Sequence, residues 1–320
     1  MTGPALAGRK KVLGAVLALI AFPVVLAMAE AVSYYSLNQN NGGIVSSGER
    51  REYLLYVPGS YDRTKPTPLV ISLHGAGMWP ASQREVSQWN RVADRHGVVV
   101  VYPSGIRGGG GARIWRSGSA SRSEPGLMKD VRFISELIDT LEASFNIDPA
   151  RIYANGLSNG GGMSFVLSCT LSDRIAAVGM VGAAHLLPWN WCTDHRAVPM
   201  ISFHGTADSA APFHGGASWV APGVLFPDIR TWTANWAGRN GCAANPTESM
   251  VAADVSRREY AHCASDASVV LYTILGGGHT WPGGGPFPEW FVGTTTHNID
   301  ASELMWEFFR DHPLRPTQPN

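Results

Sequence analysis

A serine inside a short glycine-flanked motif is the first residue whose setting could support catalysis. Ser158 is the central residue of Gly156-Leu157-Ser158-Asn159-Gly160, which matches the pattern Gly-x-Ser-x-Gly. The pattern is weak by itself, but residues 151–155 before it favour a strand and residues 159–171 after it favour a helix. A sharp strand-to-helix turn exposes a serine hydroxyl at a sheet edge, and the start of the helix directs backbone N–H groups toward it. The sequence therefore predicts that Ser158 is a nucleophile.

A serine hydroxyl needs a general base at neutral pH. His279 is the strongest candidate, because its glycine-rich loop, residues 276–283, comes directly after a predicted strand at 268–275. His74 and His204 each end a predicted strand just before a glycine, which favours a structural role or a place in the wall of a cleft. The remaining histidines have no comparable setting. We therefore predict that His279 is the base.

The acid that orients this histidine should follow a strand between the serine and the histidine, because that chain order is typical of enzymes with this serine turn. Asp208 fits, since it ends the motif His204-Gly205-Thr206-Ala207-Asp208 after a predicted strand at 198–203. Asp228 and Asp254 are rivals, but neither follows an apolar strand. We expect Asp208 to accept a hydrogen bond from Nδ1–H of His279 and to stabilise the imidazolium.

Two backbone N–H groups are expected to form an oxyanion hole. One should belong to Asn159, the residue after the nucleophile. The other should lie in the loop after the strand that ends at Leu73, with Ala76 as the preferred donor and Gly75 or Gly77 as alternatives.

The apolar residues of the chain alternate between strand-like runs and helix-like periods. Strands are predicted at 51–57, 68–73, 98–102, 151–155, 176–182, 198–203 and 268–275. Helices are predicted at 130–145, 159–171 and 228–237, and a last helix begins at Asp300, where Glu303 would complete a pair resembling a capping box. This alternation predicts an α/β fold, with a mostly parallel central sheet covered by helices on both faces.

Residues 1–31 have the features of an export signal. Arg9, Lys10 and Lys11 precede an uncharged run, and small residues follow it. Cleavage would give a secreted protein. Retention would anchor the protein in a membrane through residues 12–29, with its main body outside the cytoplasm. We expect a linker at 32–47, one catalytic domain at 48–312 and a loose tail at 313–320.

The cysteine content is consistent with export. An even number of cysteines in an exported protein implies disulfides, and the chain has Cys169, Cys192, Cys242 and Cys263. Three pairings are open, of which the sequential one would close two loops of just over twenty residues. The cysteine spacing matches no zinc site, because no Cys-x-x-Cys pair is present.

Composition excludes several classes of protein. With 45% hydrophobic and 16% charged residues, the chain is too apolar to be disordered. Lys and Arg together number 25, as do Asp and Glu, so no overall charge favours a nucleic-acid partner.

A set of motifs in a fixed order resembles one known family. The motifs are Leu73-His74-Gly75, Tyr102-Pro103-Ser104-Gly105, Asp130-Val131 with Phe133-Ile134, Gly156-Leu157-Ser158-Asn159-Gly160-Gly161, His204-Gly205-Thr206-Ala207-Asp208, Asn240-Gly241-Cys242 and Gly277-Gly278-His279-Thr280-Trp281-Pro282-Gly283. Together they resemble the esterase family of polyhydroxybutyrate depolymerases and feruloyl esterases. The resemblance covers about residues 48–310 and implies an α/β-hydrolase fold and a secreted serine esterase that needs no metal or organic cofactor. An additional Gly162 before Met163 departs from the family's usual serine block.

The substrate is less well defined by the sequence. We expect His74, Trp79, Trp115 and Trp281 to contact it. Trp281 is two residues after the predicted base, His74 ends the strand before the proposed oxyanion loop, Trp79 follows that loop, and Trp115 lies in a long loop at 104–127. An aromatic cleft suits a polyester chain or a feruloyl ring. We favour a polyester depolymerase that acts as a monomer, with a feruloyl or acetyl-xylan-type esterase of plant cell walls as the alternative. A serine peptidase of the same fold and a non-catalytic anchored binding protein are the rival classes.

Overall fold

The computed structural model describes residues 39–107, 113–117, 125–192, 196–285 and 287–315. Residues Asn40–Asn320 form a compact unit. The predicted export segment 1–31, residues 32–38 of the predicted linker and residues 316–320 of the predicted tail lie outside the described residues. Within the described ranges, no helix is both long enough and apolar enough to cross a bilayer.

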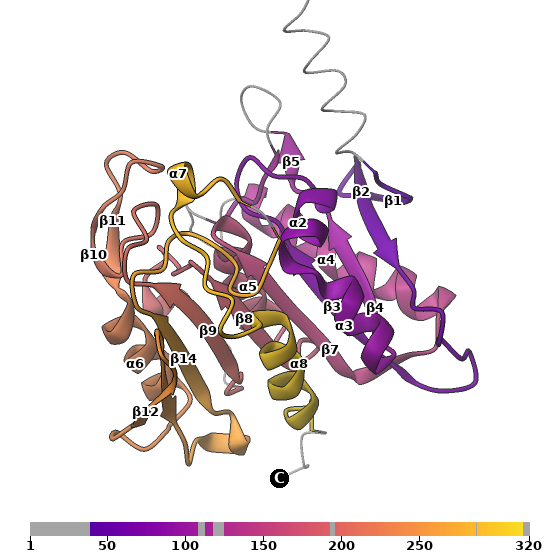
Figure 1. Ribbon diagram of the computed structural model, residues 1–320. Helices are drawn as coiled ribbons and strands as arrows, with labels where there is room; N and C mark the ends of the chain where they lie inside the picture. The colour runs from indigo at the N-terminus through magenta and orange to yellow at the C-terminus, as the bar shows by residue number, and fades with distance from the viewer. Residues whose placement is uncertain (1–38, 108–112, 118–124, 193–195, 286, 316–320) are drawn as a thin grey trace, which may run out of the picture. The chain divides into compact units, whose positions relative to one another are not determined.

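A ten-stranded sheet is the framework of this unit (Figure 1). From one edge to the other, its strands are β1 (Gly42–Ser46), β2 (Glu49–Tyr56), β4 (Val99–Pro103), β3 (Thr67–Leu73), β7 (Ile147–Leu157), β8 (Ala177–Val181), β9 (Met200–Gly205), β14 (Val269–Ile274), β13 (Val255–Tyr260) and β12 (Thr247–Ala252). The strands from β4 to β14 in this order are parallel, and an antiparallel pair flanks them on each side. The predicted mostly parallel sheet is therefore confirmed.

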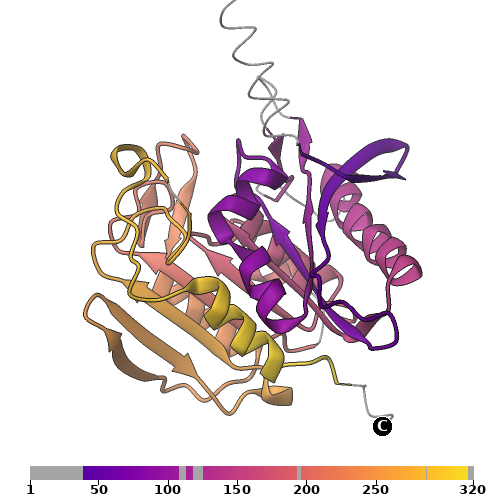
Figure 2. The ribbon, with the colours of Figure 1, turned by 45° about the vertical axis from the view of Figure 1, so that its right-hand side comes forward.

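Helices cover both faces of the sheet, as predicted. One face carries α2 (Pro80–Ser87), α3 (Trp89–His96) and α8 (Ala301–Asp311). The other carries α4 (Pro125–Ser144), α5 (Asn159–Thr170) and α6 (Ile229–Arg239). The helices α3 and α8 lie side by side although they are far apart in sequence (Figures 1 and 2). In β3 the residues 69–71 are all apolar because both faces of the strand are covered: Leu69 and Ile71 pack in one core and Val70 in the other.

Three strands were missed by the sequence analysis, and all three lie in the antiparallel flanks. Most side chains of β12 are exposed, and β1 and β13 alternate or mix polar residues with apolar ones, so none forms an apolar run. Two small two-stranded sheets were missed as well. One pairs β5 (Ile106–Arg107) with β6 (Arg113–Ile114), and the other pairs β10 (His214–Ala217) with β11 (Leu225–Asp228).

The last helix begins where the sequence predicts. The Asp300 carboxylate accepts hydrogen bonds from the amides of Ser302 and Glu303, both at 3.1 Å, which caps the start of α8. The Glu303 carboxylate extends instead to helix α3, where it contacts Arg95 and lies 3.0 Å from Nε2 of His96. The contact therefore joins two helices on one face of the sheet.

Both disulfides form, and their pairing is the sequential one. Cys169 bonds Cys192 across 23 positions, and Cys242 bonds Cys263 across 21. The first bond begins in α5, the helix that follows the predicted nucleophile. The second joins the end of α6 to the loop that leads into β14.

The topology brings the three predicted catalytic residues to one edge of the sheet. Ser158 follows β7, Asp208 follows β9 and His279 follows β14, and these strands are parallel with only β8 between β7 and β9. The carboxyl ends of parallel strands meet at the same edge, which is where ligands bind in sheets of this kind.

Candidate active site

The turn between β7 and α5 holds Ser158 in an unusual backbone conformation. Its φ is 53° and its ψ is −118°, whereas most non-glycine residues have a negative φ. Such strain costs on the order of 1–3 kcal/mol and persists only where the surroundings impose it. The tight turn needs a glycine at position 160, because a Cβ there would lie 2.2 Å from the Leu73 carbonyl oxygen. The additional Gly162 is accommodated within the first turn of α5, where its amide donates to the Ser158 carbonyl at 3.0 Å.

Asp208 and His279 form a direct hydrogen-bonded pair. Nδ1–H of His279 donates to Oδ2 of Asp208 at 2.7 Å, while Oδ1 of Asp208 accepts from the amides of Ala210 at 2.9 Å and Ala211 at 2.7 Å. Burial alone would raise the pKa of Asp208, but the His279 hydrogen bond and the nearby amide and histidine groups outweigh it and hold the pKa below its usual value. Asp208 is therefore an anion that fixes the orientation of the imidazole.

A glycine at the end of β8 makes room for this pair. Gly182 has a φ of +53°, and a Cβ there would lie 3.0 Å from Nδ1 of His279 and 3.2 Å from Oδ2 of Asp208. A side chain at this position would therefore press on both partners of the hydrogen bond.

The loop that carries His279 is held between two other segments. On one side, the Gly277 carbonyl accepts from the Ala207 amide at 2.9 Å. On the other, the amides of Gly278 and His279 donate to the carbonyls of Thr294 and Val292, at 2.9 and 2.6 Å. His279 is thus fixed through its main chain as well as through its imidazole.

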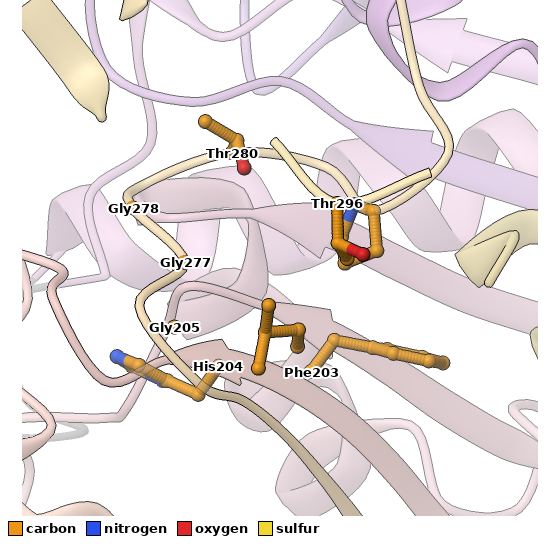
Figure 3. Close-up of a pocket in the computed structure, with 9 residues that line it drawn as sticks. Phe203, His204, Gly205, Gly277, Gly278, Thr280 and Thr296 are labelled. Carbon is orange, nitrogen blue, oxygen red and sulfur yellow. The ribbon is translucent and has the colours of Figure 1, made fainter. Parts of the chain in front are cut away.

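A small cavity lies under this loop (Figure 3). The chain through Gly277, Gly278 and Thr280 passes over His204 and Phe203 at the end of β9. The volume of this cavity, about 10 Å³, is far below the roughly 300–1,000 Å³ that is typical of ligand pockets. His204 is buried beside it, and its Nε2–H donates to the Ala211 carbonyl at 2.7 Å. Burial lowers the pKa of His204 below its ordinary value, so a neutral histidine lies 3.5 Å from Asp208.

The substrate-sized cavity lies above the sheet edge and has a volume of about 770 Å³. Ser158 and His279 both line it. Most of the other lining residues are glycine, alanine or apolar, namely Gly75, Ala76, Gly77, Met78, Ile114, Leu157, Gly162, Gly182, Ala183, Ala184, Leu186, Ala210, Ala211, Trp219, Val220, Ala221, Val224, Phe226, Phe287, Phe291 and Val292. This composition suits a neutral, largely apolar ligand.

The predicted oxyanion donors belong to the same cavity. Ala76 and Asn159 both line it, and neither amide has a hydrogen-bond acceptor among the described residues. The Gly77 amide donates to the Arg113 carbonyl at 2.8 Å and is therefore engaged elsewhere. The geometry thus favours Ala76 over Gly77, as the sequence analysis did.

The expectation that His74, Trp115 and Trp281 contact substrate is wrong, because all three are buried away from the cavity. Nδ1–H of His74 donates to the Gly75 carbonyl at 2.8 Å, its Nε2 accepts from Gly105, and burial lowers its pKa to about 4. Both tryptophans also have partners in the interior. Nε1–H of Trp115 donates to the His74 carbonyl at 3.1 Å, and that of Trp281 donates to Oγ of Ser302 at 3.1 Å.

Trp79 does not line the cavity either, although it is partly exposed. Different aromatic residues occupy the cavity mouth. Trp219, after β10, and Phe291, in the short helix α7 (Glu289–Val292), line the cavity and pack edge to face with ring centroids 5.3 Å apart. Next to them, Trp290 is 87% exposed. We call Trp219, Trp290 and Phe291 the aromatic rim. No pattern in the sequence pointed to Trp219.

Comparison with known proteins now gives the family. A family described as "Esterase PHB depolymerase" matches residues 51–187. A protein named as an esterase, NocK of Nocardia uniformis subsp. tsuyamanensis, is 30% identical over 281 residues, which are 83% of this chain and 80% of the relative. The chain belongs to the esterase family of polyhydroxybutyrate depolymerases and feruloyl esterases. This esterase is accordingly a carboxylic ester hydrolase.

Two other comparisons describe the breadth of the family and the fold. Feruloyl esterase B of Piromyces equi is 32% identical over 235 residues, and the esterase matches 72% of its own length but only 42% of that relative. An acetyl xylan esterase from Aspergillus awamori has the same fold, with a TM-score of 0.55 at 17% identity over 86% of this chain and 96% of that one. The predicted α/β-hydrolase fold is confirmed by this likeness.

Proposed function

We propose that this esterase is a serine enzyme in which Ser158 is the nucleophile, His279 the general base and Asp208 the orienting acid. The observation that carries the proposal is the 2.7 Å hydrogen bond from Nδ1–H of His279 to a buried Asp208 carboxylate, beside an apolar cavity that both Ser158 and His279 line. With Nδ1 engaged by the acid, Nε2 of His279 is the nitrogen that can accept a proton from the serine.

The proposed reaction transfers an acyl group in two steps. Oγ of Ser158 attacks the ester carbonyl carbon while Nε2 of His279 takes the hydroxyl proton, and the carbonyl oxygen becomes an oxyanion. The amides of Ala76 and Asn159 donate to this oxyanion, whose stabilisation is commonly the largest contribution to catalysis in such sites. The tetrahedral intermediate then releases the alcohol, which receives the proton from His279. Water, activated by the same histidine, hydrolyses the acyl-serine and restores the enzyme.

We propose an aliphatic polyester of the hydroxybutyrate type as the substrate. Aliphatic side chains dominate the cavity wall, and the aromatic rim extends the apolar surface from the cavity to its exterior. An extended apolar chain could therefore contact the protein beyond the ester that is cleaved. A hydroxycinnamoyl ester is the second candidate, because relatives named as feruloyl esterases match and because Phe226, Phe287 and Phe291 could stack on an aromatic acyl group.

We further propose that the esterase is exported and works as a monomer outside the cytoplasm. Two disulfides close within the compact unit, and such bonds persist in oxidising compartments. The basic and apolar pattern of residues 1–31 supports the same conclusion. N-terminal sequencing of the exported protein distinguishes a cleaved signal from an anchor at residues 12–29.

The decisive experiment measures initial rates on a hydroxybutyrate oligomer and on methyl ferulate, with Ser158→Ala as the control. Faster turnover of the oligomer supports the polyester proposal, whereas faster turnover of methyl ferulate replaces it with the feruloyl alternative. A matched amide substrate in the same assay tests for peptidase activity. Equal rates for the wild-type protein and Ser158→Ala on every substrate would favour a binding protein and overturn the proposed mechanism.

A further inference from the structure

A buried ion pair lies behind the active site and plays no part in the proposed reaction. NH1 of Arg51 is 2.8 Å from Oδ1 of Asp130, and the two side chains are only 4% and 0% exposed. The Arg51 guanidinium also lies over the Phe133 ring, 4.1 Å from its centroid. Replacing a buried ion pair with apolar residues is often neutral or stabilising, so its presence is weak support for a role in stability.

The ion pair holds the main chain at Ser104 and at Arg116. NH2 of Arg51 donates to the Ser104 carbonyl at 3.2 Å. Oδ2 of Asp130 accepts from the Arg116 amide at 3.0 Å. The pair therefore holds segment 113–117 at Arg116.

Segment 113–117 is also bonded to the first of the two proposed oxyanion elements, the loop after β3. The Arg113 carbonyl accepts from the Gly77 amide at 2.8 Å, and Nε1–H of Trp115 donates to the His74 carbonyl at 3.1 Å. These bonds lie on both sides of Ala76 in sequence. The segment thus holds the loop that presents the Ala76 amide.

The same segment is bonded to the second oxyanion element, the start of helix α5. The Asn159 carboxamide makes a matched pair of bonds to the Trp115 main chain, because its Oδ1 accepts from the amide at 2.6 Å and its Nδ2 donates to the carbonyl at 3.0 Å. Nδ2 also donates to Oγ of Ser117 at 2.8 Å. Asn159, whose main-chain amide is one of the two proposed oxyanion donors, is therefore held in place by its own side chain.

We infer that Arg51 and Asp130, acting through segment 113–117 and the Asn159 carboxamide, are positioning residues that set the spacing of the two oxyanion amides. The inference rests on the proposed function. Ala76 and Asn159 belong to separate elements, and an oxyanion hole needs its donors about 2.7–3.1 Å from the developing charge. Segment 113–117 is hydrogen-bonded to both elements, so a displacement of this segment moves one donor relative to the other.

Two variants test the inference. Asn159→Ala keeps the proposed oxyanion amide and removes its clamp, while the ion pair stays intact. The double variant Arg51→Met with Asp130→Leu removes both charges at similar volume, which avoids leaving a single buried charge. Glu142→Gln is the matched control, because Glu142 lies in the same helix as Asp130 and its ion pair, with Arg174 at 2.9 Å, is remote from segment 113–117.

The assay compares kcat and KM for p-nitrophenyl butyrate across pH, with thermal unfolding to verify the fold. We expect Asn159→Ala and the double variant to lose roughly 100-fold in kcat, the effect of a small misplacement of catalytic groups, with KM changed less than about twofold. The pH profile should match that of the wild type, because the Asp208–His279 pair is untouched. Glu142→Gln should retain the wild-type kcat.

Other outcomes overturn the inference. A folded Asn159→Ala protein and a folded double variant with wild-type kcat would show that the segment does not set the donor spacing. A pH dependence of kcat that is shifted from that of the wild type would indicate that the variants act through His279 instead. A wild-type protein no more active than Ser158→Ala would reject the proposed function itself, and the inference with it.

Discussion

His185 makes folding stability sensitive to acid, because its imidazole is buried in a cluster of aromatic rings. The ring stacks on Phe165 with centroids 3.6 Å apart, and the Trp189 and Trp232 rings lie 4.5 and 5.4 Å away. Burial lowers the pKa of His185 from 6.5 to about 3, although a hydrogen bond to the Leu187 backbone favours a higher pKa. The folded protein therefore holds this histidine neutral at pH values where an unfolded chain would protonate it.

The expected loss of stability follows from these pKa values. Between pH 6.5 and about 3, the unfolded chain binds a proton at His185 that the folded protein does not, so the free energy of unfolding falls as the pH falls through this window. Each pH unit within the window costs about 1.4 kcal/mol, which gives about 2 kcal/mol between pH 8 and pH 5. His74, with its pKa lowered to about 4, adds a similar amount. The wild type should lose about 4 kcal/mol from these two groups.

The variant His185→Phe isolates one of these contributions, because a phenyl ring can remain in the aromatic stack but does not titrate. Urea unfolding followed by tryptophan fluorescence at pH 8 and pH 5 measures the change. We expect the variant to lose about 2 kcal/mol less than the wild type over this interval. His214→Gln is the control, since His214 is exposed and the variant should behave as the wild type. Equal losses in His185→Phe and the wild type would refute the reasoning.

Three further predictions concern catalysis, the disulfides and the substrate. Asp208→Asn should lower kcat for p-nitrophenyl butyrate by roughly 10⁴-fold, because the neutral amide does not hold His279 in the same tautomer, and a rate within tenfold of wild type would contradict this. Replacing Cys242 and Cys263 with serine should lower the free energy of unfolding by about 3 kcal/mol in urea titrations, and an unchanged midpoint would show that this bond is dispensable. Trp290→Ala should slow hydrolysis of a suspended polyester by about tenfold while leaving p-nitrophenyl butyrate unaffected, and equal effects on both substrates would argue against the role of the aromatic rim.

The sequence was sufficient to bring Ser158, Asp208 and His279 together because each comes within five residues of the end of a buried strand. Such strands form short apolar runs, and their carboxyl ends meet at one edge of a parallel sheet. The serine motif added a local constraint, since its glycines permit a turn that few other sequences can form. The fold and the geometry of these residues were therefore predictable from local patterns.

The residues around the substrate were harder to predict because position in sequence does not determine the direction of a side chain. Trp281 is two residues from His279, yet its ring turns into the core and is hydrogen-bonded to Ser302. Trp219 is far from every catalytic motif, yet it lines the cavity because the hairpin of β10 and β11 places it there. Strands such as β12 were missed for a related reason, since their exposed side chains leave no apolar period to detect.

The place of β14 in the sheet has a consequence for the order in which the chain becomes active. The strand comes late in the sequence, lies between β9 and β13 in the sheet, and is followed five residues after its end by His279. A chain that is synthesised or translocated from its N-terminus presents Ser158 first, Asp208 next and His279 last. On the proposed mechanism, Ser158 therefore has no partner to accept its proton until β14 has entered the sheet. A chain of which only the N-terminal part has emerged would then hydrolyse no ester, and hydrolysis would begin only when nearly the whole chain has emerged and folded.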